Sequence, residues 1–112
     1  MQIPNAERAV IEPAKLHAYL LSRNHSIGRF KATFFLALGY SENWRQLEEH
    51  LRSQHLSQDA TADERTPYGQ KYAIRATLVG PSGRSAEVVS VWVVRTGEEF
   101  ARLVTAYPEG SR

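Results

Sequence analysis

Cysteine is absent from this sequence, and no apolar run approaches the roughly 18 residues that a membrane-spanning helix needs. Without cysteine there are no disulfides and no thiolate metal sites, so a stable fold has to rest on packing. The first residues, Met1–Asn5, also lack the charged and apolar regions of a secretion signal. These absences predict a cytoplasmic protein that does not contact membranes.

The size and composition suit one domain over residues 1–112. Hydrophobic residues make up 42% of the chain and aromatic residues 10%, which is enough for a modest core. The formal net charge is +2, a mildly basic balance that permits nucleic acid binding without requiring it.

The first half of the chain has helical periodicity. Pro13 favours the first position of a helix, whose buried stripe is predicted to be Leu16, Tyr19 and Leu20. The segment 27–38 carries an apolar stripe that ends at Gly39, and Asn43 is a good N-cap for a third helix. We therefore expect helices between about residues 13 and 55.

The second half alternates with a period of two after a polar segment, 57–66, that we predict to be a loop. The predicted strands are 70–79, 85–95 and 100–107, joined by turns at 80–83 and 96–99. The expected fold class is α+β, with N-terminal helices packed on one face of a C-terminal antiparallel sheet of three to four strands.

The two turns allow an estimate of strand register. Centred turns place Thr105 opposite Ser90 and Ser90 opposite Ala73, to within about one residue, and a slip of one residue would exchange the two faces of the sheet. The predicted face away from the helices mixes cations, hydroxyls and aromatic rings: Lys71, Arg75, Ser90, Trp92, Leu103, Thr105 and Tyr107.

Cations beside stackable rings suit single-stranded RNA, because the charges meet phosphates and the rings meet bases. We therefore predict that Lys71, Arg75, Ser90 and Trp92 bind RNA. An ordinary solvent-exposed face is the alternative interpretation.

A second group of candidates surrounds the start of the second predicted helix. Arg29 and Lys31 lie near free backbone donors at a helix N-terminus, a combination that favours phosphate. His25 precedes them and can transfer a proton near neutral pH, although a capping or surface role is the simpler reading. His50 and His55 are five residues apart, a spacing that does not favour a metal site. No metal or cofactor is expected.

The last predicted strand places Thr105 and Tyr107 on one face, just before Pro108. Two hydroxyls on rigid backbone can grip a phosphate. Helices followed by an antiparallel sheet that ends in Thr105-Ala106-Tyr107-Pro108 resemble the barnase–EndoU–colicin–RelE group of ribonucleases. That group includes many C-terminal toxin domains of contact-dependent growth inhibition and polymorphic toxin systems.

A further resemblance lies in the first half of the chain. The segment Tyr19–Leu21, followed by His25, by Gly28–Ala32 and by Phe35, is similar to a bacterial domain family of unassigned function. Members of that family occur as short proteins and at the ends of large secreted ones.

The ribonuclease resemblance implies metal-independent cleavage of RNA, commonly tRNA, through attack by the RNA's own 2′-hydroxyl. Carried over by position, His25 is the general base, and Arg29 or Lys31 stabilises the phosphorane. Thr105 binds a phosphate oxygen, and Tyr107 orients it or helps to protonate the leaving oxygen. The implied partners are RNA and an immunity protein or antitoxin. The implied location is the cytoplasm, reached by delivery into a target cell if the chain is part of a larger toxin.

The sequence departs from this pattern in one respect, since it offers no second histidine or well-placed glutamate for the acid step. Two other functions stay open. One is a non-catalytic RNA-binding or protein-interaction module on the same fold, and the other is an enzyme of another class that acts on nucleotides. For a ribonuclease, His25 should lie across a cleft from Thr105 and Tyr107, within about 8 Å, so that one phosphate touches all three.

Overall fold

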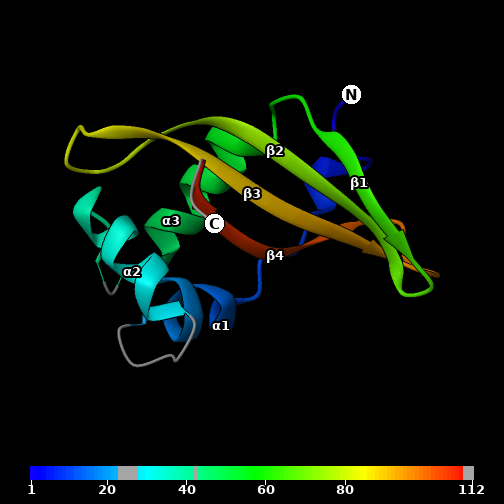
Figure 1. The fold of residues 1–112 in the computed structure, drawn as a ribbon, viewed down its shortest axis with the longest axis horizontal. Coiled ribbons are helices and arrows are strands. Elements are labelled where there is room, and N and C mark those ends of the chain that lie inside the picture. The colour runs from blue at the N-terminus through cyan, green and yellow to red at the C-terminus, as the bar shows by residue number, and fades with distance from the viewer. Residues whose placement is uncertain (23–27, 42, 110–112) are drawn as a thin grey trace.

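The computed structural model describes residues 1–22, 28–41 and 43–109, with helices that precede a sheet along the chain (Figure 1). Two α-helices run directly into π-helices, which close hydrogen bonds over one more residue than an α-helix does. Among the described residues, no helix is long and apolar enough to cross a membrane. The helical elements are η1 (Ala6–Arg8), α1 (Pro13–Lys15), the π-helix η2 (Leu16–Leu20), α2 (Gly28–Ala37), α3 (Trp44–His50) and the π-helix η3 (Leu51–His55).

The sheet has four antiparallel strands in the order β1-β2-β3-β4, which confirms the predicted α+β class. The strands are β1 (Thr61–Thr66), β2 (Gly69–Val79), β3 (Ser85–Arg95) and β4 (Ala101–Pro108). The predicted loop 57–66 is wrong over its second half, where β1 lies. All of β1 except Thr66 is exposed, so no apolar alternation marks it in the sequence.

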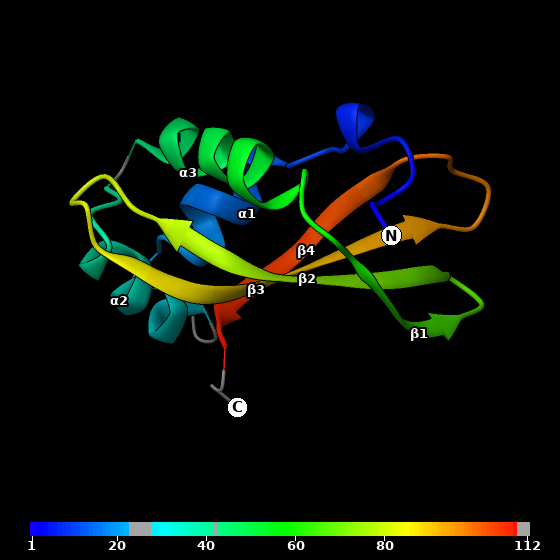
Figure 2. The same ribbon diagram turned by 90° about the horizontal axis from the view of Figure 1, so that it is seen from above.

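The helices gather on one side of the twisted sheet, towards the end where β2 turns into β3 (Figures 1 and 2). The β1–β2 hairpin extends beyond them at the other end. One hydrophobic core joins the helices to the sheet and includes the fully buried side chains Leu20, Phe35, Leu47, Ile74 and Trp92.

The structure differs by one residue from the register that centred turns predict, both between β2 and β3 and between β3 and β4, where Thr105 pairs with Val91 and not with Ser90. Ser90 pairs with Ile74, not with Ala73, because the connection between Val79 and Ser85 holds five residues where a four-residue turn was expected. Ser90 and Trp92 are therefore fully buried on the helix side, and the prediction that they lie on an exposed face is wrong.

The observed register also changes which side chains lie on the face of the sheet away from the helices. Valines 89, 91 and 93 of β3 now share this face with Lys71 and Arg75 of β2. The predicted mixture of cations and a tryptophan is thus replaced by β-branched side chains between cations.

A buried polar network replaces purely apolar packing at one point of the core. The indole Nε1 of Trp92 donates to Oγ of Ser90 at 2.9 Å, and the same oxygen lies 2.7 Å from Nδ1 of His55. Burial lowers the pKa of His55, while the carbonyl of Ala76 and the charge of Glu87 act in the opposite direction. The other ring nitrogen, Nε2, is buried and has no hydrogen-bond partner among the described residues.

The C-terminal end of α2 is fixed to the sheet by the β2–β3 turn. The backbone N–H and the hydroxyl of Ser82 both donate to the carbonyl of Leu38, at 3.2 and 2.8 Å. Gly80 lies against the same residue so closely that an added Cβ would collide with the Leu38 carbonyl. This contact sets where α2 sits over the sheet.

Candidate functional site

Three polar side chains from three elements meet beside β4. The Nζ of Lys31, on α2, donates to the hydroxyl of Tyr19, on η2, at 2.9 Å. That hydroxyl lies 3.2 Å from Oγ1 of Thr105, on β4. All three side chains are half-buried, so their polar ends meet at the surface of the domain.

The chain before the first helix explains why η2 lies over β4. Val10 forms a parallel bridge with Arg102: its N–H donates to the carbonyl of Ala101 at 2.8 Å, and its carbonyl accepts from Leu103 at 3.0 Å. The segment thus runs along the edge of β4 and delivers α1 and η2 to the same edge.

A β-bulge in β4 places the threonine. Val91 pairs with Thr105 while the next residue, Trp92, pairs with Leu103, so Val104 is the extra residue of the strand. Val104 and Thr105 both line the hollow that faces η2. Bulges commonly re-aim a side chain in this way beside functional sites.

The electrostatic surroundings of Tyr19 favour its phenolate. Burial acts to raise the pKa of Tyr19, but the hydrogen bonds with Lys31 and Thr105 and the charges of Lys31 and Lys15 outweigh it and leave the pKa lowered. The two ammonium groups lie over its ring, with Lys31 Nζ 5.2 Å and Lys15 Nζ 5.9 Å from the ring centroid.

Tyr19 and Thr105 of this cluster line a groove of about 570 Å³, a size typical of small-molecule sites. One carboxylate, Glu12, lies at its rim and pairs with Arg102 at 3.2 Å, and Arg102 also pairs with Glu98 at 2.9 Å. The groove therefore presents ammonium and hydroxyl groups with its nearest acid already paired, which favours an anion such as a phosphate. It is lined by Glu12, Ala14, Lys15, Ala18, Tyr19, Val104 and Thr105.

The predicted site residues fall into three groups. Lys31 and Thr105 are brought together, although through Tyr19 and not directly. Tyr107 lies two residues after Thr105 on β4 and on the same face of the strand. It is half-buried and pairs with Val89 of β3. His25 and the side chain of Arg29 lie outside the described residues, so their convergence with Thr105 stays a prediction.

Sequence reasoning assigned Tyr19 to the buried stripe of the first helix and so missed it as a site residue. The available signal was Lys15, four residues earlier, because residues at that spacing are neighbours on a helix.

The predicted RNA-binding face is only partly available. Lys71 lies 3.6 Å from Glu64 and Arg75 lies 3.8 Å from Glu109, so both cations have acidic neighbours at the surface. Ser90 and Trp92 are buried and cannot contact RNA. RNA contact by Lys71 and Arg75 stays a prediction.

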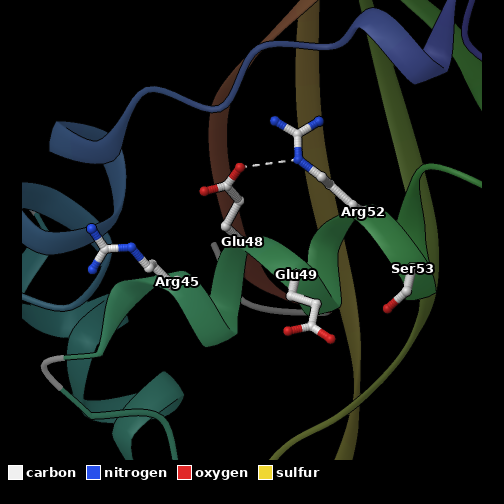
Figure 3. A pocket seen from close by; sticks show the side chains of 5 residues that line it. All are labelled: Arg45, Glu48, Glu49, Arg52 and Ser53. Atoms are coloured by element: carbon white, nitrogen blue, oxygen red, sulfur yellow. Dashed lines mark hydrogen bonds and ion pairs between the residues drawn. The ribbon is translucent and has the colours of Figure 1, made fainter.

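A second hollow, of about 430 Å³, lies on α3 and η3 (Figure 3). Arg52 turns towards Glu48 at 3.0 Å and also donates to the carbonyl of Ala9, at 2.8 Å. Arg45 stacks over the ring of Trp44. These side chains already bind one another or the fold, and none of the predicted site residues lies there. Within residues 1–22, 28–41 and 43–109, no three acidic or histidine side chains are grouped as a metal site.

The domain is of the α+β class. Its helices lie over a four-stranded antiparallel sheet, and a polar groove lies at the last strand. The fold is similar to that of one chain in a contact-dependent growth inhibition toxin–immunity protein complex from Klebsiella pneumoniae 342, with a TM-score of 0.62 and 18% sequence identity. The match covers 95% of this chain and 97% of that chain.

The sequence profile of the family described as Domain of unknown function (DUF6883) matches residues 2–110, and the chain belongs to this family. This agrees with the predicted resemblance to a family of unassigned function. No curated protein matches the sequence significantly.

Proposed function

We propose that this domain is a metal-independent ribonuclease of the toxin kind, which cleaves RNA through attack by the 2′-hydroxyl on the adjacent phosphate. The observation that carries the proposal is the chain of hydrogen bonds from Lys31 to Tyr19 to Thr105, because Tyr19 and Thr105 line one groove together with Lys15. One ammonium and two hydroxyls, in which Tyr19 contacts both of the others, match the oxygens of a single phosphate.

The chemistry assigns a role to each group. As the 2′-oxygen attacks, negative charge builds on the phosphate oxygens, and Lys31 and Thr105, which both contact the Tyr19 hydroxyl, stabilise it. The roles of base for His25, of a further cation for Arg29 and of orienting hydroxyl for Tyr107 follow from the ribonuclease resemblance.

The likeness of fold to a chain of the Klebsiella toxin–immunity protein complex supports a place in a toxin system. We accordingly propose an immunity protein as the partner and tRNA as the first substrate to test. A module that binds RNA or protein without cleaving it fits the same fold, and the experiment below separates the two.

The decisive experiment incubates the purified protein with total RNA in EDTA and identifies the ends of the fragments. The proposal expects 2′,3′-cyclic phosphate and 5′-hydroxyl ends. Lys31→Met keeps most of the side-chain volume without the charge, and Thr105→Val keeps the shape without the hydroxyl. Each should slow cleavage about 10²- to 10³-fold, the usual loss for one group that stabilises transition-state charge.

Arg84→Met is the matched control, since Arg84 is an exposed cation in the β2–β3 turn, and it should cleave like the parent protein. RNA that binds but stays intact would replace the ribonuclease with a binding module. Cleavage that requires a divalent metal would overturn the mechanism.

A further inference from the structure

We infer that Tyr19 is the general acid of the proposed ribonuclease and passes its phenolic proton to the leaving 5′-oxygen. The inference rests on the proposed function and supplies the acid step for which the sequence offers no second histidine. The sequence prediction gave help with this step to Tyr107, on β4.

The hydrogen bonds of Tyr19 carry the argument. A lysine ammonium can only donate, so Lys31 donates to the phenolic oxygen at 2.9 Å. The Thr105 hydroxyl, 3.2 Å away, can accept from a phenol or, after rotation, donate to a phenolate. Both neighbours therefore stabilise the ion that remains once the proton has left.

The charges around the ring act in the same direction. Lys15 and Lys31 lie over the ring face, where a cation is attracted to the π-electrons and still more to a phenolate. The resulting lowering of the pKa of Tyr19 makes its proton easier to transfer.

The position of Tyr19 also fits the step. It lines the groove beside Thr105, and its hydroxyl also contacts Lys31, so a phosphate held by these two groups would lie next to the phenolic oxygen. A proton donor must come within about 3 Å of the leaving oxygen, and Tyr19 contacts both groups proposed to hold the phosphate next to that oxygen.

The 2′-oxygen forms a bond to phosphorus and gives its proton to the base or to water. The bond between phosphorus and the 5′-oxygen breaks, and the 5′-oxygen takes the proton of Tyr19. The phenolate, held by Lys31 and Thr105, regains a proton from solvent before the next turnover.

The test measures the rates at which the parent protein and Tyr19→Phe cleave two substrates. Tyr19→Phe keeps the ring and removes only the hydroxyl. One substrate is RNA, whose 5′-alkoxide leaving group needs a proton. The other is a uridine 3′-phosphodiester with a p-nitrophenolate leaving group, which leaves without one. Tyr19→Phe should slow RNA cleavage about 10²- to 10⁴-fold. With the p-nitrophenyl substrate it should stay close to the parent rate.

Tyr68→Phe is the matched control, because Tyr68 is an exposed tyrosine in the β1–β2 turn, far along the sequence from the groove. It should leave both rates unchanged. Equal losses of Tyr19→Phe on both substrates would overturn the acid role and leave the ribonuclease standing. A parent protein that cleaves neither substrate would overturn the proposed function, and the acid role with it.

A second measurement does not depend on cleavage. The ultraviolet absorbance of phenolate, followed against pH and taken as the difference between the parent protein and Tyr19→Phe, reports the titration of Tyr19 alone. The transition should lie below that of an ordinary tyrosine and should move up in Lys31→Met. A transition at the ordinary position would contradict the proposed surroundings of the acid.

Discussion

Nδ1 of His55 and Oγ of Ser90 lie 2.7 Å apart in the core and join η3 to β3. Ser90 accepts the indole N–H of Trp92, and its own hydroxyl proton is available to donate to Nδ1. This arrangement suits a neutral imidazole and links three side chains that the sequence distributes over 38 positions, from His55 to Trp92.

Ser90→Ala should destabilise the domain, because it leaves the Trp92 N–H and Nδ1 of His55 buried without a partner. The expected loss in the free energy of unfolding is about 1–3 kcal/mol, measured by urea denaturation. Ser85→Ala, at the exposed start of β3, is the control and should change the free energy by less than about 0.5 kcal/mol. Equal effects of the two substitutions would mean that the network does not stabilise the fold.

Stability should fall as the pH drops below about 6.5, the ordinary pKa of histidine. The pKa of His55 is lowered in the folded state, so between that lowered value and 6.5 the unfolded chain binds a proton that the folded protein does not. Within this window, each fall of one pH unit then lowers the free energy of unfolding by up to about 1.4 kcal/mol. Above this window both states are neutral, and the contribution of His55 is fully present.

Urea denaturation between pH 5 and 7.5 measures this dependence. His55→Gln should remove that part of the slope, whereas His17→Gln, at an exposed histidine on η2, should retain it. An unchanged slope in His55→Gln would assign the acid sensitivity to other groups.

RNA affinity should decrease with salt, because each phosphate contact releases counterions with a slope of about 0.7 on logarithmic axes for single strands. Lys31→Met should lower that slope by about 0.7 if Lys31 holds one phosphate. Fluorescence anisotropy with a 2′-O-methyl RNA, which cannot be cleaved by this route, gives the slope directly. Arg84→Met should keep the parent slope, and a Lys31→Met slope equal to it would remove Lys31 from the phosphate site.

Gly80→Ala should destabilise the domain and loosen the position of α2. A Cβ at Gly80 would collide with the carbonyl and side chain of Leu38, and such overpacking costs about 1–3 kcal/mol. Gly83→Asn, in the same turn, meets open space at a φ of 87° that asparagine tolerates, and should be nearly neutral. Thermal unfolding compares the two. A Gly80→Ala protein as stable as Gly83→Asn would show that the turn yields without cost.

Local patterns were enough to predict most elements of this fold. The β-branched run between two glycine-containing turns gave β3 its bounds, Ser85–Arg95, because strand propensity and turn residues act within a few positions. Register could not be predicted in the same way. One additional residue in the β2–β3 connection and one bulge at Val104 decide which face each side chain occupies, and neither leaves a strong signal in the sequence.

In the candidate site, too, local sequence patterns predicted some residues and missed one. Lys31 and Thr105 were found because their chemistry and local positions indicate phosphate binding. Tyr19 was not, since an aromatic residue in an apolar helix stripe is typical of a core. Only the tertiary contact with α2 and β4 gives its hydroxyl a role.

The number of residues in each of the two π-helices determines where the polar side chains of Tyr19 and His55 lie. Tyr19 lies in η2 and His55 in η3, and each extends a polar atom to a neighbouring strand. A π turn holds about one more residue than the α turn it replaces. Deletion of one residue from either would restore α geometry and rotate the following side chains by about 100°. Single-residue insertions and deletions, which loops commonly absorb, should therefore be excluded from these two turns in any working relative of the domain.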